Sequence, residues 1–119
     1  RSYTEHAKSG PLTTSIMRWF MDTYLDGLAP ADPATEIMFP GRRIPLSGFP
    51  RSLLVTADQD PLRDDGKRLA NALQRAGVTV QHEHFSQEAH GFPCSEGPTP
   101  GHERFMSLTK AWVEEISAR

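Results

Sequence analysis

An α/β fold built around a strand–helix–strand unit is the class that this sequence predicts. Three neighbouring stretches carry the prediction: an apolar run, LLVTA, at 53–57, an amphipathic stretch at 64–76, and a second β-like stretch, VTVQHEHF, at 78–85. Elements in this order are typical of two parallel strands joined by a crossover helix, which is right-handed in nearly all proteins. The chain has 119 residues, enough for one domain or part of one, and we expect a single partial domain over 1–119.

An amphipathic helix is predicted at 13–25, ahead of the unit. Thr13 or Thr14 can cap its first turn. Its large apolar residues recur at helical spacing. They are Ile16, Trp19, Phe20 and Tyr24. We therefore predict that Trp19 and Phe20 lie in the core.

A long connection is predicted at 26–50. It contains five prolines among Gly and Asp residues, namely Pro30, Pro33, Pro40, Pro45 and Pro50. Connections of this length are uncommon unless they serve a site or pack on other structure.

The two strands and the helix between them differ in their patterns. The run at 53–57 has no alternation, which favours a strand buried on both faces. The helix at 64–76 has Asp64 and Asp65 in its first turn, where the helix dipole favours negative charge, and Gly77 ends it. The stretch at 78–85 alternates and mixes polar with apolar residues, as a strand near a sheet edge can.

A closing amphipathic helix is predicted at 102–117. One stripe carries Phe105, Leu108, Trp112 and Ile116. Trp112 is predicted to belong to the core.

Two parallel strands make an incomplete sheet, because such pairs usually have neighbours and two covered faces. One edge of the 53–57 strand has no predicted partner. We expect another chain, or a second copy of this one, to pair with it, and the pure chain then to dimerise or aggregate. The alternative is that Glu36 to Phe39 fold back over that edge.

Composition excludes several classes of function. The net charge is −2 and the basic residues are scattered, which argues against nucleic acid and anionic membrane surfaces. No stretch is long and apolar enough to span a membrane. Cys94 is the only cysteine, which fits a reducing compartment, and we expect a cytoplasmic protein without a cofactor.

Candidate catalytic residues come after the two predicted strands. Asp58 and Asp60 come after the first, and His90 comes after the second. Ligands of open α/β sheets bind beyond the carboxyl ends of the strands, so we expect Asp60 and His90 at one rim. A carboxylate there can orient an imidazole that acts as a general base. The alternative is that the Asp caps the next helix and the His pairs with a nearby carbonyl.

Two stretches of the chain resemble a known family. The stretch "LLVTADQDPLRDDGKRLANALQRAGVTVQHEHFSQEAHGF", with its D-P-L-R-D-D-G and H-G-F motifs, resembles the C-terminal part of α/β-hydrolase esterases of the hormone-sensitive-lipase-like group. "LTTSIMRWFMDTYL" resembles that group's helix before its penultimate strands. The resemblance implies an α/β-hydrolase fold, with Asp60 as the acid and His90 as the base of a Ser-Asp-His triad.

The sequence departs from that family in two places. "EIMFPGRRIPLSGFP" replaces the usual small-residue S-P-L stretch. No G-x-S-x-G nucleophile elbow and no H-G-G-G-type segment occurs. The nearest match to the elbow is GPTPG at 97–101, with Thr99 in the place of the serine, but it follows no strand and its prolines prevent the tight turn. Thr99 is therefore not the nucleophile, and the serine is expected from a missing N-terminal part.

Two other groups of residues could in principle carry chemistry. Cys94 lies four positions after His90, but no helix start or cationic cluster is evident to lower its pKa. His82 and His84 have the spacing of two metal ligands, yet no Cys or carboxylate cluster completes a site. A free thiol and two half-exposed histidines are the favoured interpretations, with no metal.

Two functions remain open. The first is a segment of a serine carboxylesterase that hydrolyses small-molecule esters only when the N-terminal part supplies the serine, so that the 119 residues alone are inactive. The second is a non-catalytic α/β module that binds a partner, or itself, through its open strand edge.

Overall fold

A computed structural model of the chain describes residues 1–29, 32, 45–97 and 99–118. A parallel strand–helix–strand unit forms its centre, as the sequence predicts. The elements in chain order are α1 (Ser2–Glu5), α2 (Thr14–Leu25), β1 (Ser52–Gln59), α4 (Arg63–Arg75), β2 (Val80–Ala89), the 3-10 helix η2 (Phe92–Cys94) and α5 (His102–Ser117).

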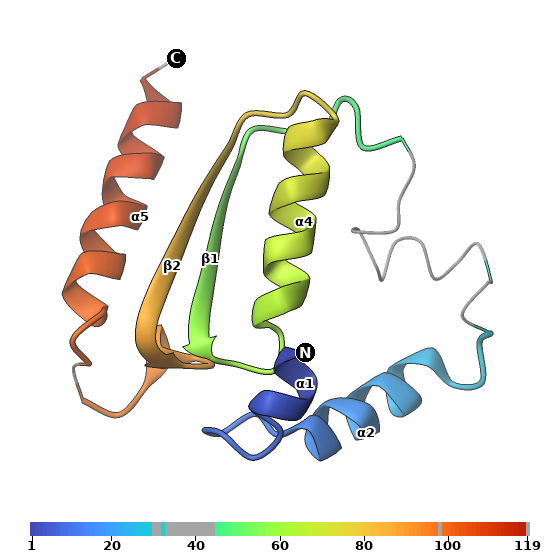
Figure 1. Ribbon diagram of the computed structural model, residues 1–119. Coiled ribbons are helices and arrows are strands. Elements are labelled where there is room, and N and C mark those ends of the chain that lie inside the picture. Colours follow the sequence, from blue (N-terminus) through green and yellow to red (C-terminus); the bar gives the residue numbers. More distant parts are fainter. Residues whose placement is uncertain (30–31, 33–44, 98, 119) are drawn as a thin grey trace.

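The two strands lie between two helices, α4 on one side and α5 on the other (Figure 1). β1 and β2 pair in parallel, with Ser52 opposite Val80 and Ala57 opposite Phe85. Gly66 of α4 lies against Thr56, so close that a Cβ on Gly66 would be 2.5 Å from the Thr56 Cγ2. The missing side chain at Gly66 thus lets α4 pack closely on this face of the sheet.

The other face of the sheet carries a small aromatic core. Ala57, Phe85 and Phe92 are buried together, and Phe105 and Leu108 of α5 pack against them. The rings of Phe85 and Phe92 are 5.0 Å apart, and those of Phe92 and Phe105 are 5.7 Å apart in an edge-on arrangement. Edge-on and tilted contacts of this kind add to the stability that burial supplies.

Predicted and observed element bounds agree best for the helices. The closing helix spans His102–Ser117, as predicted, and α2 and α4 begin within one residue of the prediction. The strands are longer than predicted because β1 continues to Gln59 and β2 to Ala89, through polar residues that carry no β pattern. The short elements α1 and η2 were not predicted.

The prediction that Trp19 and Phe20 lie in the core is wrong. Trp19 is 62% exposed and Phe20 is 53% exposed, whereas Met17 is the buried residue of α2. Helical spacing identifies an apolar face but not what covers it, and nothing in the described part of the chain covers this one. Trp112 is half-buried, with the Arg51 guanidinium 4.3 Å from its ring centroid, and Ile116 is exposed.

The prediction that LLVTA is buried on both faces holds only for its end. Thr56 and Ala57 are buried, whereas Leu53, Leu54 and Val55 are half-exposed. Within the described residues, β1 pairs only with β2, so its second edge has no strand beside it. Glu36 to Phe39, the alternative cover for this edge, lie outside the described residues.

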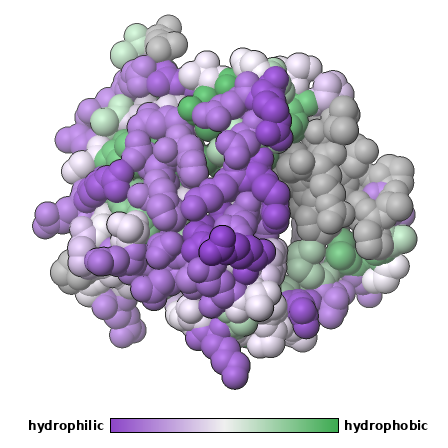
Figure 2. All heavy atoms as spheres, viewed as in Figure 1, coloured by the Kyte–Doolittle hydropathy of each residue, from purple (hydrophilic) through white to green (hydrophobic). Residues whose placement is uncertain are grey.

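The face of the molecule seen in Figure 2 is largely hydrophilic, with hydrophobic residues in small separate patches. Among the helices that the structure describes, none has the length and apolar character that a membrane span needs.

Candidate active site

Asp60 stands directly after β1, and its two carboxylate oxygens have different partners. Oδ1 accepts a hydrogen bond of 2.8 Å from the backbone N–H of Leu62, the residue at the start of α4. Oδ2 lies 2.9 Å from Nδ1 of His90. One oxygen therefore pairs with the imidazole, while the other stabilises the turn that leads into α4, whose N-cap residue Leu62 has no side-chain cap.

His90 stands directly after β2, where the pairing of Gln59 with Ala89 brings the ends of both strands together. Its side chain is 39% exposed, while the side chain of Asp60 is only 12% exposed. The acid is thus shielded from water and the imidazole can be reached. Because Nδ1 faces the carboxylate, Nε2 is the ring atom that remains for a proton from a third group.

The loop that carries Asp60 is tied to the first residues of the chain. Ser2 is fully buried and its hydroxyl donates a hydrogen bond of 2.6 Å to the carbonyl of Pro61. Its backbone N–H donates a 2.8 Å hydrogen bond to Asp64. This backbone N–H and the nearby Arg63 guanidinium lower the pKa of Asp64 to about 2. α1 therefore docks on the loop through paired polar groups, which is how such groups can be buried at low cost.

Arg63 is the centre of the charged contacts in this loop. Its side chain is 11% exposed and lies 2.7 Å from Glu5, 3.2 Å from Asp58 and 3.2 Å from Asp64. Its Nη1 is also 2.9 Å from Nε2 of His6. One guanidinium with several donors in a fixed plane can join these groups at once. Asp58, the other candidate carboxylate, is thus engaged by Arg63 rather than by His90.

Aromatic packing holds the segment that carries His90. Gly91, the next residue, has φ 76°, a left-handed conformation that glycine adopts without strain. This turn directs Phe92 into the core against Phe85. The turn and the buried ring together fix the backbone on the C-terminal side of the imidazole.

His82 and His84 share one face of β2 and converge on one hydroxyl. His82 Nε2 and His84 Nδ1 each lie 3.0 Å from Oγ1 of Thr56. Burial, and then the nearby Lys67 ammonium, lower the pKa of both imidazoles. No group of three metal-ligating side chains that could hold an ion is found among the residues described, and Cys94 is exposed with a free thiol.

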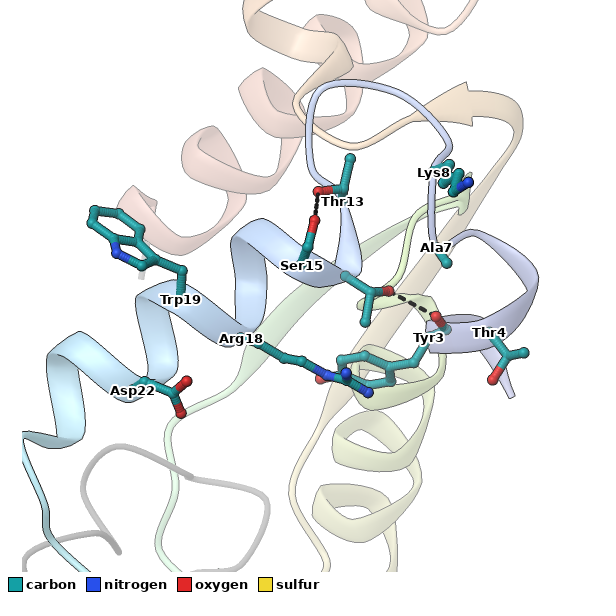
Figure 3. A pocket seen from close by; sticks show the side chains of 10 residues that line it. Tyr3, Thr4, Ala7, Lys8, Thr13, Ser15, Arg18, Trp19 and Asp22 are labelled. Carbon is teal, nitrogen blue, oxygen red and sulfur yellow. Dashed lines mark hydrogen bonds between the residues drawn. The ribbon is translucent and has the colours of Figure 1, made fainter.

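A hollow of about 660 Å³ lies between α1 and α2 (Figure 3). Arg18 projects from α2 toward α1, while Trp19 projects from α2 in another direction. Neither Asp60 nor His90 lines this hollow. Its lining offers no nucleophile paired with a base, so we place the candidate chemistry at Asp60 and His90 instead.

The sequence predicted that Asp60 and His90 lie at one rim, as they do in the structure, but not which residues surround them. Arg63 lies inside the D-P-L-R-D-D-G motif, which was a usable signal. Ser2 and Glu88 carry no pattern that marks them, yet both are buried.

Helices on both faces of parallel strands, with an acid and a histidine at the carboxyl ends, are typical of an α/β hydrolase. The chain belongs to the alpha/beta hydrolase fold family, whose model matches residues 1–94. The resemblance read from the motifs is thereby confirmed.

Curated relatives and solved structures agree with this assignment. Carboxylesterase NlhH of Mycobacterium tuberculosis is 36% identical over 95 residues, which cover 76% of this chain and 29% of the relative. Carboxylic ester hydrolase LipN of the same species is 37% identical over 109 residues, which cover 88% of this chain and 29% of LipN. A fungal esterase structure from Rhizomucor miehei superposes with a TM-score of 0.84 at 28% identity. The superposition covers 96% of this chain and 35% of the esterase chain. The chain thus spans about 29% of the length of these two curated relatives.

Proposed function

We propose that this chain supplies the acid and the base of a serine carboxylesterase, with Asp60 as the triad acid and His90 as the triad base. One observation carries the proposal: the 2.9 Å contact between Asp60 Oδ2 and His90 Nδ1 at the carboxyl ends of two parallel strands. The nucleophilic serine and the oxyanion-hole donors would come from a segment N-terminal to these 119 residues, as part of the same domain.

The proposed steps use each atom of the pair. His90 Nε2 takes the proton of the serine hydroxyl as its oxygen attacks the ester carbonyl, and the Asp60 carboxylate stabilises the imidazolium that forms. The imidazolium then protonates the departing alcohol, which leaves an acyl-enzyme. Water, deprotonated by His90, hydrolyses the acyl-enzyme, and the serine regains its proton while the carboxylic acid is released.

Several observations outside the pair support this function. The relatives are named as carboxylesterases or carboxylic ester hydrolases, and small-molecule esters are the substrates that these names suggest. The family's triad order, with serine first, fits an acid and a base in this segment. The single cysteine, Cys94, supports a cytoplasmic location as part of the proposal.

Hydrolysis of a short-chain aryl ester tests the proposal. The 119 residues alone should show no turnover above the rate in buffer, because they hold no serine elbow and no oxyanion donors. In the protein at its natural length, Asp60→Asn should lower kcat by about 10⁴-fold and His90→Gln by a similar factor.

Two neighbouring residues provide matched controls. Asp58→Asn removes a carboxylate two positions from Asp60, and His84→Gln removes an imidazole from the strand that precedes His90. Both should leave kcat within about 3-fold of the unmodified protein, because neither group contacts the pair. Full activity in His90→Gln would contradict the proposal, and so would turnover by the 119 residues alone that this substitution abolishes.

A second function rests on the edge of β1. Only β2 pairs with β1 among the described residues, and an exposed strand edge is a template for another strand. In this reading the chain is a non-catalytic module that binds a partner or a second copy. A dimer in sizing experiments that Val55→Pro dissociates, together with an inactive natural-length protein, would favour it. A monomer would count against it.

A further inference from the structure

Glu88 is a buried carboxylate two residues before His90 that the steps above do not use. It is 4% exposed, whereas its neighbours Ser86 and Gln87 are exposed. Its Oε1 accepts a hydrogen bond of 2.6 Å from the backbone N–H of Gly101. A carboxylate rarely occupies such a position without a specific partner, because its burial is costly.

An irregularity in β2 explains how Glu88 comes to point inward. Ala57 pairs with Phe85 and Gln59 pairs with Ala89. Between these two pairs, β2 therefore advances by four residues while β1 advances by two. Gln87, inside this bulge, has φ 68°. A bulge re-aims the side chains around it. Here it buries Glu88 immediately before the strand delivers His90.

The partner of Glu88 is the start of α5. Gly101 is the N-cap residue of that helix, and no side chain of its own segment caps it. The first N–H groups of a helix lack partners within the helix, and negative charge is favourable there. Glu88 therefore caps α5 from a different element, and the contact closes a loop that contains His90.

Gly101 has a steric reason to be glycine. Its φ of −83° and ψ of −15° suit any residue, so the backbone does not require it. A Cβ at this position would lie 2.8 Å from Glu88 Oε1 and 2.9 Å from its Cγ. Because Gly101 has no side chain, the Glu88 carboxylate can approach the Gly101 N–H.

We propose that Glu88 is a positioning residue: its hydrogen bond to Gly101 fixes the backbone before His90 and holds the imidazole against Asp60. The inference rests on the proposed esterase function. Phe92 anchors the same loop after His90, so the base is fixed on both sides. Loss of the Glu88 contact should let the imidazole move relative to Asp60, and displacements of about 1 Å can cost about 100-fold in rate.

The test compares two substitutions of nearly equal size in the natural-length protein. Glu88→Gln keeps an oxygen that can accept from Gly101, and kcat should stay within about 3-fold. Glu88→Met fills the same space without an acceptor, so kcat should fall by about 10- to 100-fold while KM changes less than about 2-fold. The downfield proton resonance of the Asp60–His90 hydrogen bond, identified by its absence in His90→Gln, should broaden or shift in Glu88→Met only.

Two further variants keep the test decisive. Gly101→Ala leaves Glu88 in place but pushes its carboxylate away, and it should reproduce the loss in kcat even where Glu88→Met fails to fold. Glu83→Met removes another carboxylate of β2 that contacts α5, through the 2.5 Å pair with Arg104, and it should leave kcat within about 2-fold.

The outcomes separate this inference from the proposed function. Activity that survives His90→Gln contradicts the esterase proposal itself. Activity lost in His90→Gln but unchanged, with an unchanged resonance, in folded Glu88→Met or Gly101→Ala overturns only the role of Glu88. A loss in Glu88→Gln as large as that in Glu88→Met also overturns it, since the acceptor is then irrelevant.

Discussion

The acid and the base of the candidate pair are held by two different kinds of structure. Around Asp60, the loop is fixed by charged and polar groups, with Arg63 joining several carboxylates and Ser2 buried against Pro61. Around His90, aromatic packing of Phe92 fixes the chain after the base, and Glu88 with Gly101 is the one polar contact that we propose to fix it before the base. One hydrogen bond therefore joins a polar region to an apolar one.

Because of this difference, the two regions should respond differently to salt, pH and substitution. Charge–charge contacts weaken with added salt and change with pH, whereas apolar burial does not weaken in salt and depends on volume. Perturbing one region should therefore leave the other intact, although the 2.9 Å pair needs both.

The largest effect is expected from the aromatic core. Phe85 is 2% exposed and touches both Phe92 and Phe105. Phe85→Ala should lower the free energy of unfolding by about 3–5 kcal/mol, because it leaves a cavity. Denaturant unfolding at low and high salt measures this loss, which should be the same in both.

Phe20 offers the matched control for that substitution. It is 53% exposed, so Phe20→Ala should change the free energy of unfolding by less than about 0.5 kcal/mol. A loss at Phe20 as large as that at Phe85 would show that α2 is covered in solution.

An intermediate effect is expected in the polar region. Arg63→Met removes a guanidinium that is 11% exposed and leaves Glu5, Asp58 and Asp64 without it. We expect a loss of about 2–3 kcal/mol at low salt, since a partly buried group with several partners is removed. Unlike the Phe85→Ala loss, this one should shrink in 1 M salt, which unfolding curves in the two buffers will measure.

Arg68 lies on the same helix and serves as the control. It pairs with Asp65 at the surface, with 67% of its side chain exposed. Arg68→Met should cost less than about 1 kcal/mol. Equal losses at both arginines would contradict a special role for Arg63.

The smallest effect is expected at Asp64 and depends on pH. Its pKa is lowered from 3.8 to about 2, chiefly by the Ser2 N–H and then by Arg63. A carboxyl with a lowered pKa stabilises the fold above its unfolded pKa, and this stability is lost as pH falls through about 2. Asp64→Asn should therefore cost about 1–2 kcal/mol at pH 7 and almost nothing near pH 2.

Unfolding curves of Asp64→Asn across this pH range provide the measurement. Glu114→Gln, which removes one partner of an exposed pair with Lys110, should change stability little at any pH. A loss in Asp64→Asn that does not vary with pH would mean that the carboxylate charge is not what stabilises the loop.

Sequence patterns predicted the central elements because those elements are defined by local periodicity. The apolar run of β1 and the amphipathic spacing of α4 and α5 identify these elements, and Ala70 and Leu73 of α4 are buried. In α5 the predicted stripe is only partly buried. Asp60 and His90 could be paired in advance because parallel strands end at one rim. The polar ends of both strands could not be predicted, since they are held by pairing and not by pattern.

The sequence by itself determined the strand–helix–strand order and the two residues at its rim, because short-range spacing encodes both. Only the tertiary structure decided that Ser2 is buried against Pro61, that Glu88 turns inward to Gly101, and that the aromatic face of α2 is exposed. The contact of Ser2 with Pro61 joins residues 59 positions apart, and that of Glu88 with Gly101 joins residues 13 positions apart. Whether a group is buried depends on what packs against it, and no local pattern records that.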